Sequence, residues 1–108
     1  MTIRRSELFD ADLERQFRWY LLKTRLDPAP ALELAGRFAD AVDRTLNLLR
    51  SNPKIGRPRF VIFSDLPGIR SVGLERPFHR FLIFYRIEGT TIYSERLLEG
   101  HRRIAGTR

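Results

Sequence analysis

The sequence predicts a single α+β domain over residues 1–108, in which a short strand and an antiparallel helical hairpin precede an antiparallel sheet meander. Two observations predict this arrangement. Apolar residues recur at helical spacing up to about residue 50, and from about residue 60 they alternate with polar ones. The change of period falls on a link at 51–58 that contains two prolines and a glycine, which favours helices packed on one face of a sheet. A chain of 108 residues is also one domain by length.

Residues 2–6 are expected to form the first strand and residues 7–25 the first helix, whose apolar positions form a rough stripe. Asp27 is a good helix N-cap and Pro28 a good first helical residue, so a second helix is expected from Pro28 to about residue 50. The short turn between the helices predicts an antiparallel hairpin. The second helix has the clearer apolar face: Ala31, Leu34, Ala35, Phe38, Ala41, Val42, Leu46 and Leu49.

Turn-forming dipeptides divide the rest of the chain into strands. They are Pro67-Gly68, Arg76-Pro77 and Glu88-Gly89, and the last is typical of a tight hairpin. The strands themselves are expected at 60–64, 69–74, 78–87 and 90–98.

Alternation within the strand at 78–87 predicts which side chains share a face of the sheet. The odd-numbered set, from His79 to Ile87, is the better candidate to meet the helices, and His79 is therefore expected to be structural. The even-numbered set mixes arginines with aromatic rings on the open face, a plausible surface for RNA. Its members are Phe78, Arg80, Leu82, Phe84 and Arg86.

Two features of the sheet remain open at this point. In the alternative to an RNA surface, the arginines pair with carboxylates and two of the rings fill a minor core. The carboxylates would be Glu75, Glu88 and Glu95, and the rings Phe78 and Phe84. In the last strand, alternation places Arg96 on one face with Ile92, Ser94 and Leu98.

Positive charge is concentrated in the second half of the chain. The net charge is +7, and residues 51–108 hold eleven Lys and Arg against five Asp and Glu. This asymmetry predicts a nucleic acid, an acidic protein surface, or both, as partner. The alternative is a solvated basic surface that only aids solubility.

Several classes of protein are excluded or disfavoured. The absence of cysteine excludes disulfides and thiolate metal sites, and the two histidines show no metal-ligand spacing. No glycine pattern typical of nucleotide binding occurs, so no cofactor is expected. There is no signal-like apolar segment and no run approaching the roughly 20 apolar residues of a membrane span, so we expect a cytoplasmic protein.

His101 is the one candidate for proton chemistry near a cationic cluster. Arg102 and Arg103 follow it directly, and their charges would disfavour its protonation and leave a neutral imidazole. A neutral histidine could act as a general base, and the alternative is a surface residue in a tail.

Several short segments, in their order and spacing, resemble the RelE/ParE superfamily of bacterial toxins. Residues 46–57 resemble the link after the second helix of ParE-like toxins. Residues 69–72 (Ile-Arg-Ser-Val) resemble the family's "lRs" strand, and residues 81–86 resemble its "i.Yr" strand. Residues 97–103 resemble its closing "vlHGrRd" segment, and residues 11–13 the start of its first helix. The resemblance spans essentially the whole chain.

The resemblance implies a growth-inhibiting toxin of a type II toxin–antitoxin system, neutralised by an antitoxin encoded beside it. The RelE branch cleaves messenger RNA in the ribosome, whereas the ParE branch blocks DNA gyrase and has no established catalytic centre. A ribonuclease would use Arg70, His101 and Arg102. The chain finishes without the aromatic residue or histidine of RelE, and only Lys54 of its two lysines lies near the expected cluster. The ParE-like action is therefore favoured, with a ribosome-dependent endoribonuclease as the alternative.

Two sets of binding residues follow. Side chains off the main stripe of the helical hairpin are expected to be exposed and to bind the antitoxin. They are Trp19, Leu22 and Leu26. The gyrase-binding residues, or those for the ribosome and messenger RNA in the alternative, are expected to be Arg70, Arg80, Arg86, Arg102 and Arg103.

Overall fold

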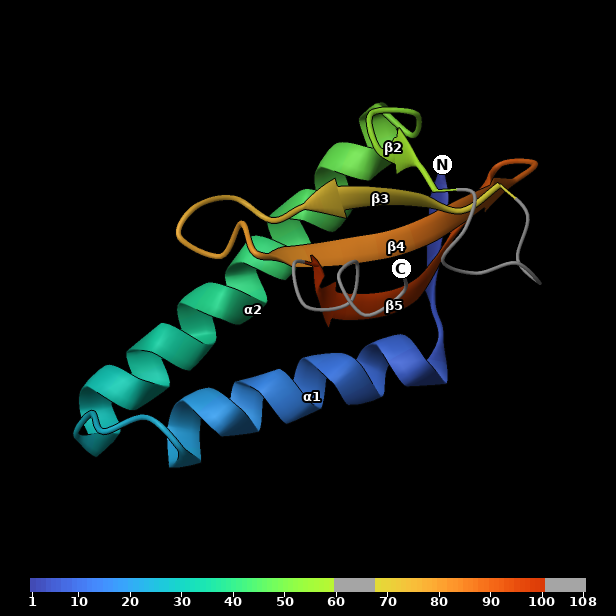
Figure 1. Ribbon diagram of the computed structural model, residues 1–108. Coiled ribbons are helices and arrows are strands. Elements are labelled where there is room, and N and C mark those ends of the chain that lie inside the picture. Colours follow the sequence, from blue (N-terminus) through green and yellow to red (C-terminus); the bar gives the residue numbers. More distant parts are fainter. Residues whose placement is uncertain (60–67, 101–108) are drawn as a thin grey trace.

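The computed structural model describes residues 1–59 and 68–100, and it confirms the predicted α+β fold (Figure 1). A short strand is followed by two helices and then by the strands of one sheet. The strand expected at 60–64 lies outside the described residues. The elements are β1 (Thr2–Arg5), α1 (Glu7–Leu22), α2 (Pro28–Ser51), β2 (Arg57–Pro58), β3 (Arg70–Gly73), β4 (Phe81–Glu88) and β5 (Thr91–Glu99).

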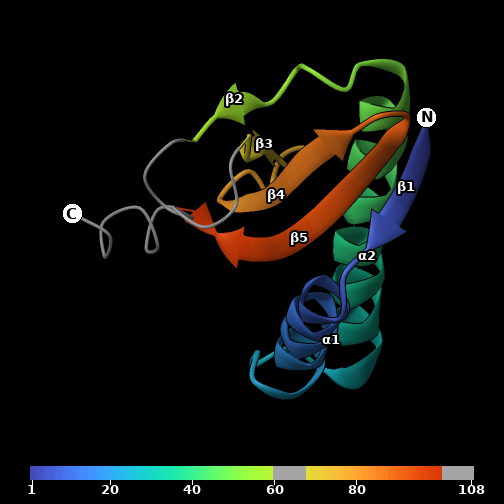
Figure 2. The same cartoon turned by 90° about the vertical axis from the view of Figure 1, so that its right-hand side faces the viewer.

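The five strands form one sheet in the order β1-β5-β4-β3-β2. Strands β2 to β5 pair antiparallel, as the meander predicts. Strand β1 lies beside β5 and runs parallel to it, with Thr2 opposite Thr91 and Arg5 opposite Ser94 (Figure 2). The sheet is therefore mixed, because β1 runs parallel to its neighbour whereas the other strand pairs are antiparallel.

The helix ends follow local capping chemistry. Ser6 caps α1, since its Oγ accepts the Phe9 N–H at 2.9 Å. Helix α1 ends at Leu22 rather than near residue 25. Asp27 occupies the N-cap position of α2 and Pro28 its first turn, but the Asp27 side chain makes no capping hydrogen bond.

The main core lies between the helices and one face of the sheet. Phe38 of α2 sits in an aromatic cluster, with its ring centroid 5.2 Å from that of Phe81 and 5.4 Å from that of Phe78. A second, smaller cluster lies on the opposite face, where Ile69, Phe84 and Leu98 are buried. The fully or nearly buried residues of the main core are Phe9, Phe38, Ala41, Val42, Leu46, Leu49, Leu74, Phe78, Ile83, Tyr85, Ile92 and Leu97.

Strand β4 begins at Phe81, which corrects two predictions. Phe78 precedes the strand in a turn closed by the Phe81 N–H on the Phe78 carbonyl, so it packs into the main core rather than on the open face. His79 lies in the same turn and is exposed, so it is not the core-facing histidine expected. Alternation does not extend into a turn.

A bulge in β5 corrects a third prediction. Phe84 pairs with Arg96 but the next residue, Tyr85, pairs with Ser94, so Glu95 is an extra residue. The extra residue reverses the alternation beyond it. Arg96 therefore does not share a face with Ser94.

Candidate functional site

The three hairpin side chains predicted to bind an antitoxin are on the surface. Trp19 is 49% exposed, Leu22 73% and Leu26 48%. The prediction that these side chains are exposed is therefore confirmed. Their exposure leaves apolar area uncovered at the end of the hairpin where α1 turns into α2, which is the kind of surface that a partner protein covers.

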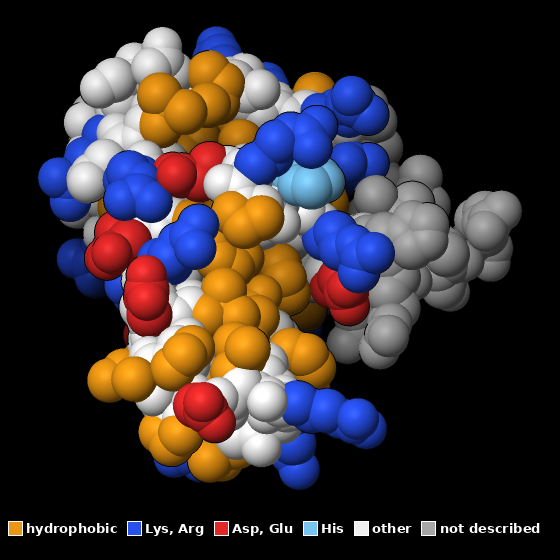
Figure 3. Space-filling model, turned by 90° about the vertical axis from the view of Figure 1, so that its left-hand side faces the viewer, with side chains coloured by type: hydrophobic (Ala, Val, Ile, Leu, Met, Phe, Trp, Pro, Cys, Tyr) orange, Lys and Arg blue, Asp and Glu red, His pale blue; other side chains and the backbone are white. Residues whose placement is uncertain are grey.

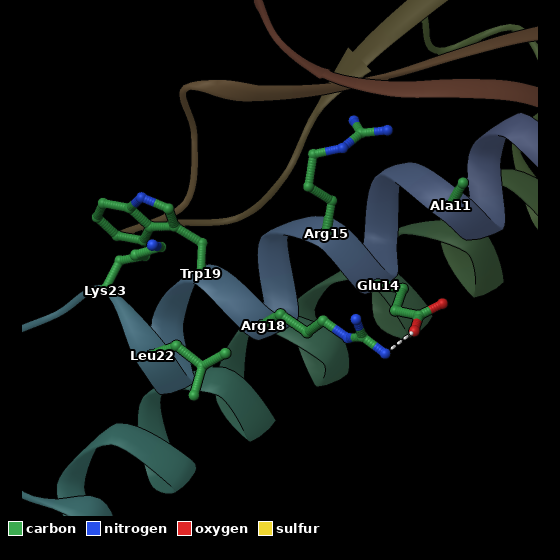
Figure 4. Close-up of a pocket in the computed structure, with 7 residues that line it drawn as sticks. All are labelled: Ala11, Glu14, Arg15, Arg18, Trp19, Leu22 and Lys23. Atoms are coloured by element: carbon green, nitrogen blue, oxygen red, sulfur yellow. Dashed lines mark ion pairs between the residues drawn. The ribbon is translucent and has the colours of Figure 1, made fainter.

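A hollow of about 460 Å³ lies along the exposed face of α1. Figure 4 shows Trp19 and Leu22 close together near the C-terminal end of the helix, and Arg18 reaching toward Glu14. That ion pair measures 2.9 Å and is open to solvent. The hollow is thus apolar at its centre and mostly cationic at its rim. It is lined by Ala11, Glu14, Arg15, Arg18, Trp19, Leu22 and Lys23.

A second hollow, of about 590 Å³, separates α1 from the end of the sheet where β4 begins. Trp19 lines both hollows, so they are neighbours along α1. At the mouth of the second, Arg80 Nη1 lies 3.7 Å from Glu99 Oε2. Figure 3 shows this end of the molecule, where hydrophobic side chains form a band flanked by Lys and Arg together with some Asp and Glu. The lining residues are Gln16, Trp19, Tyr20, Pro77, Arg80, Phe81 and Glu99.

Arg70 holds the link between α2 and β2. Its Nη1 donates to the carbonyl oxygens of Gly56 at 2.8 Å and Lys54 at 3.3 Å. On the same link, the Tyr85 hydroxyl donates to the Pro53 carbonyl at 2.7 Å and accepts the Gly56 N–H at 2.9 Å. Burial raises the pKa of Tyr85, so this hydroxyl stays protonated. Arg70 therefore has a structural role, whatever else it contacts.

Arg86 is surrounded by carboxylates. It forms ion pairs with Glu88 and with Glu95, the latter at 3.4 Å, and its guanidinium lies 4.3 Å from the centre of the Tyr93 ring. The hydrogen bond to Glu88 is the main reason that the pKa of Arg86 is raised. For Arg86, the alternative in which the arginines of the sheet pair with carboxylates is right. The alternative in which Phe78 and Phe84 fill a minor core holds for Phe84 alone, which is fully buried in the smaller cluster.

The predicted target-binding residues do not come together. Arg80 precedes β4 and Arg86 lies near its end, six residues or about 20 Å along the strand. Arg70 pairs with Tyr85 and so lies on the helix-facing side. The other two predicted residues, Arg102 and Arg103, lie outside the described residues, as does His101.

A different group of cations lies at the β2 edge of the sheet, where Arg70, a predicted target-binding residue, is joined by Arg57 and Arg59, which the sequence did not single out. We define the basic edge as Lys54, Arg57, Arg59 and Arg70. Arg57 is paired with Ser71 in the sheet, and Arg59 Nε donates to the Ser71 Oγ at 2.7 Å. The segment 51–58 was expected only to turn the chain. The available signal was the spacing of Arg57 and Arg59, two residues apart and therefore on one face of an extended chain.

Within the part of the chain that the structure describes, no group of three His, Cys, Asp or Glu side chains could hold a metal ion. Neither α1 nor α2 is long and apolar enough to span a bilayer.

Comparison with known proteins identifies the family. A family model described as the ParE toxin of the type II toxin–antitoxin system parDE matches residues 3–104. The chain belongs to the ParE toxin family. A ParE toxin is one half of a toxin–antitoxin system, so an antitoxin partner is implied.

The ParE fold is also supported by a solved structure. A chain of the "Chromosomal ParDE TA system from P. aeruginosa" superimposes on this toxin with a TM-score of 0.65 over 92% of this chain and 95% of that one, at 24% sequence identity. A search of curated proteins gave no match.

Proposed function

We propose that this ParE-family toxin inhibits growth by blocking DNA gyrase in the cytoplasm, without catalysing a reaction. The family match over residues 3–104 is the observation that carries the proposal. The chemistry of the basic edge supports it. RNA cleavage needs groups that accept and donate protons near neutral pH. Three of the four residues of the basic edge are arginines, whose pKa above about 12 makes them poor proton carriers.

We further propose that a cognate antitoxin neutralises the toxin by covering α1. The exposed Trp19 and Leu22 supply an apolar centre, and Arg15, Arg18 and Lys23 a cationic rim. An amphipathic helix with acidic flanks complements both features. The second hollow lies next to the first and reaches the start of β4, which supports a partner that follows α1 and then continues toward the sheet.

The target is tested by two measurements on the full-length toxin. In a supercoiling assay with purified gyrase we expect inhibition that added antitoxin reverses. After induction in cells, primer extension on messenger RNA should show intact transcripts, and the SOS response should be induced.

The ribonuclease alternative predicts the reverse pattern. Normal supercoiling together with codon-phased cleavage, abolished by His101→Ala, would refute the gyrase proposal. Under the gyrase proposal, His101→Ala changes little. Arg102→Ala weakens inhibition by about 1–3 kcal/mol if its charge is buried against the target.

A further inference from the structure

The basic edge gathers four cations that form no ion pair with a described carboxylate. Several arginines elsewhere do pair with carboxylates, as Arg44 does with Glu75 at 2.8 Å and Arg96 with Asp12 at 2.8 Å. Within residues 1–59 and 68–100, no carboxylate forms an ion pair with any cation of the basic edge. Its positive charge is therefore not compensated by an ion pair with any described carboxylate.

The geometry of the basic edge is fixed by hydrogen bonds to neutral groups. Ser71 holds Arg59 through Nε and leaves the two Nη groups of that guanidinium for a ligand. Arg70 donates to the backbone carbonyls of Lys54 and Gly56 through Nη1 alone. Lys54 and Arg57 are exposed. Arginines held in this way lose less side-chain entropy when an anion binds.

The spacing of these cations suits a regular row of negative charges. Arg57 and Arg59 lie two residues apart on an extended chain, so their side chains are about 6.7 Å apart. Successive phosphates on one strand of duplex DNA are displaced around the helix axis as well as by about 3.4 Å along it, so neighbouring phosphates lie roughly 6–7 Å apart, close to this distance. Arg70 pairs with Pro58, the residue between Arg57 and Arg59, so it lies on the opposite, helix-facing side of the sheet edge. Lys54 adds an exposed charge, and its backbone carbonyl accepts a hydrogen bond from Arg70.

From these observations we propose that the basic edge binds the phosphate backbone of duplex DNA. This goes beyond the gyrase proposal, because it gives the toxin a second contact that does not require the enzyme. Such a contact would be independent of base sequence, since phosphate contacts alone carry no sequence information.

Within the residues that the structure describes, the surroundings of the basic edge favour a duplex over other acidic partners. Single-stranded RNA is bound by stacking its bases on exposed rings, but Phe84 and Tyr85, the described aromatic residues facing β3, are fully buried. A protein interface needs an apolar centre, and Ile55 is the one large exposed hydrophobic residue in the described part of this link.

The test measures binding of the full-length toxin to a 20-base-pair duplex of random sequence by fluorescence anisotropy across a salt series. Four phosphate contacts predict a slope of about −3.6 in log K against log salt concentration. The double variant Lys54→Ala/Arg57→Ala should bind at least tenfold more weakly at low salt, with a slope of about −1.8. Both side chains are exposed, and neither makes a described hydrogen bond, so the variant should unfold at the same temperature as the parent.

The matched control is Arg25→Ala/Arg37→Ala, which removes the same charge from exposed positions on the helical hairpin. We expect its affinity to change by less than twofold. Equal losses in both double variants would show a net-charge effect and overturn the proposal, as would tighter binding to single-stranded RNA or no binding at 50 mM salt.

Failure of this inference can be told apart from failure of the gyrase proposal. A toxin that inhibits supercoiling but does not bind the duplex overturns only the inference. A toxin that binds the duplex and leaves supercoiling unaffected overturns only the gyrase proposal.

Discussion

The Asp12 carboxylate joins α1 to the sheet at the scale of a single residue. It is 3% exposed and accepts hydrogen bonds from Arg96 Nε and Nη2 at 2.8 and 3.0 Å and from the Leu97 N–H at 2.9 Å. Strand β1 pairs only with residues 91–94 of β5, so the side chain of Asp12 takes the place of a neighbouring strand at Leu97. In the sequence this residue could be interpreted only as an acid near a helix start.

Replacing Asp12 should destabilise the toxin strongly. In Asp12→Ala the Leu97 N–H and the partly buried Arg96 lose their acceptor, so we expect the free energy of unfolding to fall by about 2–4 kcal/mol. Urea denaturation followed by circular dichroism measures the loss. Glu14→Ala removes an exposed ion pair from the same helix and should cost less than about 0.5 kcal/mol. Similar losses in the two variants would contradict the role given to Asp12.

At the scale of an element, different side chains of α1 face three different surroundings. Phe9 is buried in the core, Asp12 contacts β5, and Trp19 with Leu22 faces solvent. The sequence predicted the exposed set because those residues fall off the main apolar stripe. It did not predict the cationic rim, since the positions of Arg15 and Lys23 around the hollow depend on how the helix lies against the sheet.

The exposed end of α1 is expected to dominate antitoxin binding. In Trp19→Ala/Leu22→Ala, loss of the apolar centre should weaken the complex by about 2–4 kcal/mol. Calorimetric titration with the purified antitoxin measures this. Leu48→Ala serves as the control, because Leu48 is 51% exposed near the opposite end of α2. If the control loses as much affinity as the double variant, the antitoxin lies elsewhere.

At the scale of the whole molecule, the sequence predicts what is local and misses what is not. Helical period, alternation and turn dipeptides identify the elements, because each depends on neighbouring residues. The parallel pairing of β1 with β5 joins segments about ninety residues apart, and no local pattern reports it. The bulge at Glu95 likewise emerges only once the strands are in register.

Removing residues 1–5 should therefore destabilise the entire domain, although the segment is short. The deletion breaks the backbone hydrogen bonds of β1 with β5 and uncovers Ile92, at an expected cost of about 3–6 kcal/mol. That is comparable with the whole stability of a small domain, about 5–15 kcal/mol. Thermal unfolding measures the change, with Ile3→Ala as a milder control. An unchanged midpoint would show that β1 is dispensable.

The pairing of β1 with β5 also sets an order of events during translation. A ribosome adds about 5–20 residues per second, so the partner of β1 is made roughly 5–20 s after β1 itself. Until then the nascent chain has its helical hairpin but an unfinished sheet edge, and Asp12 has no Arg96 to bind. The toxin thus completes its fold late in its own synthesis, which leaves an interval in which antitoxin already present can meet the exposed face of α1.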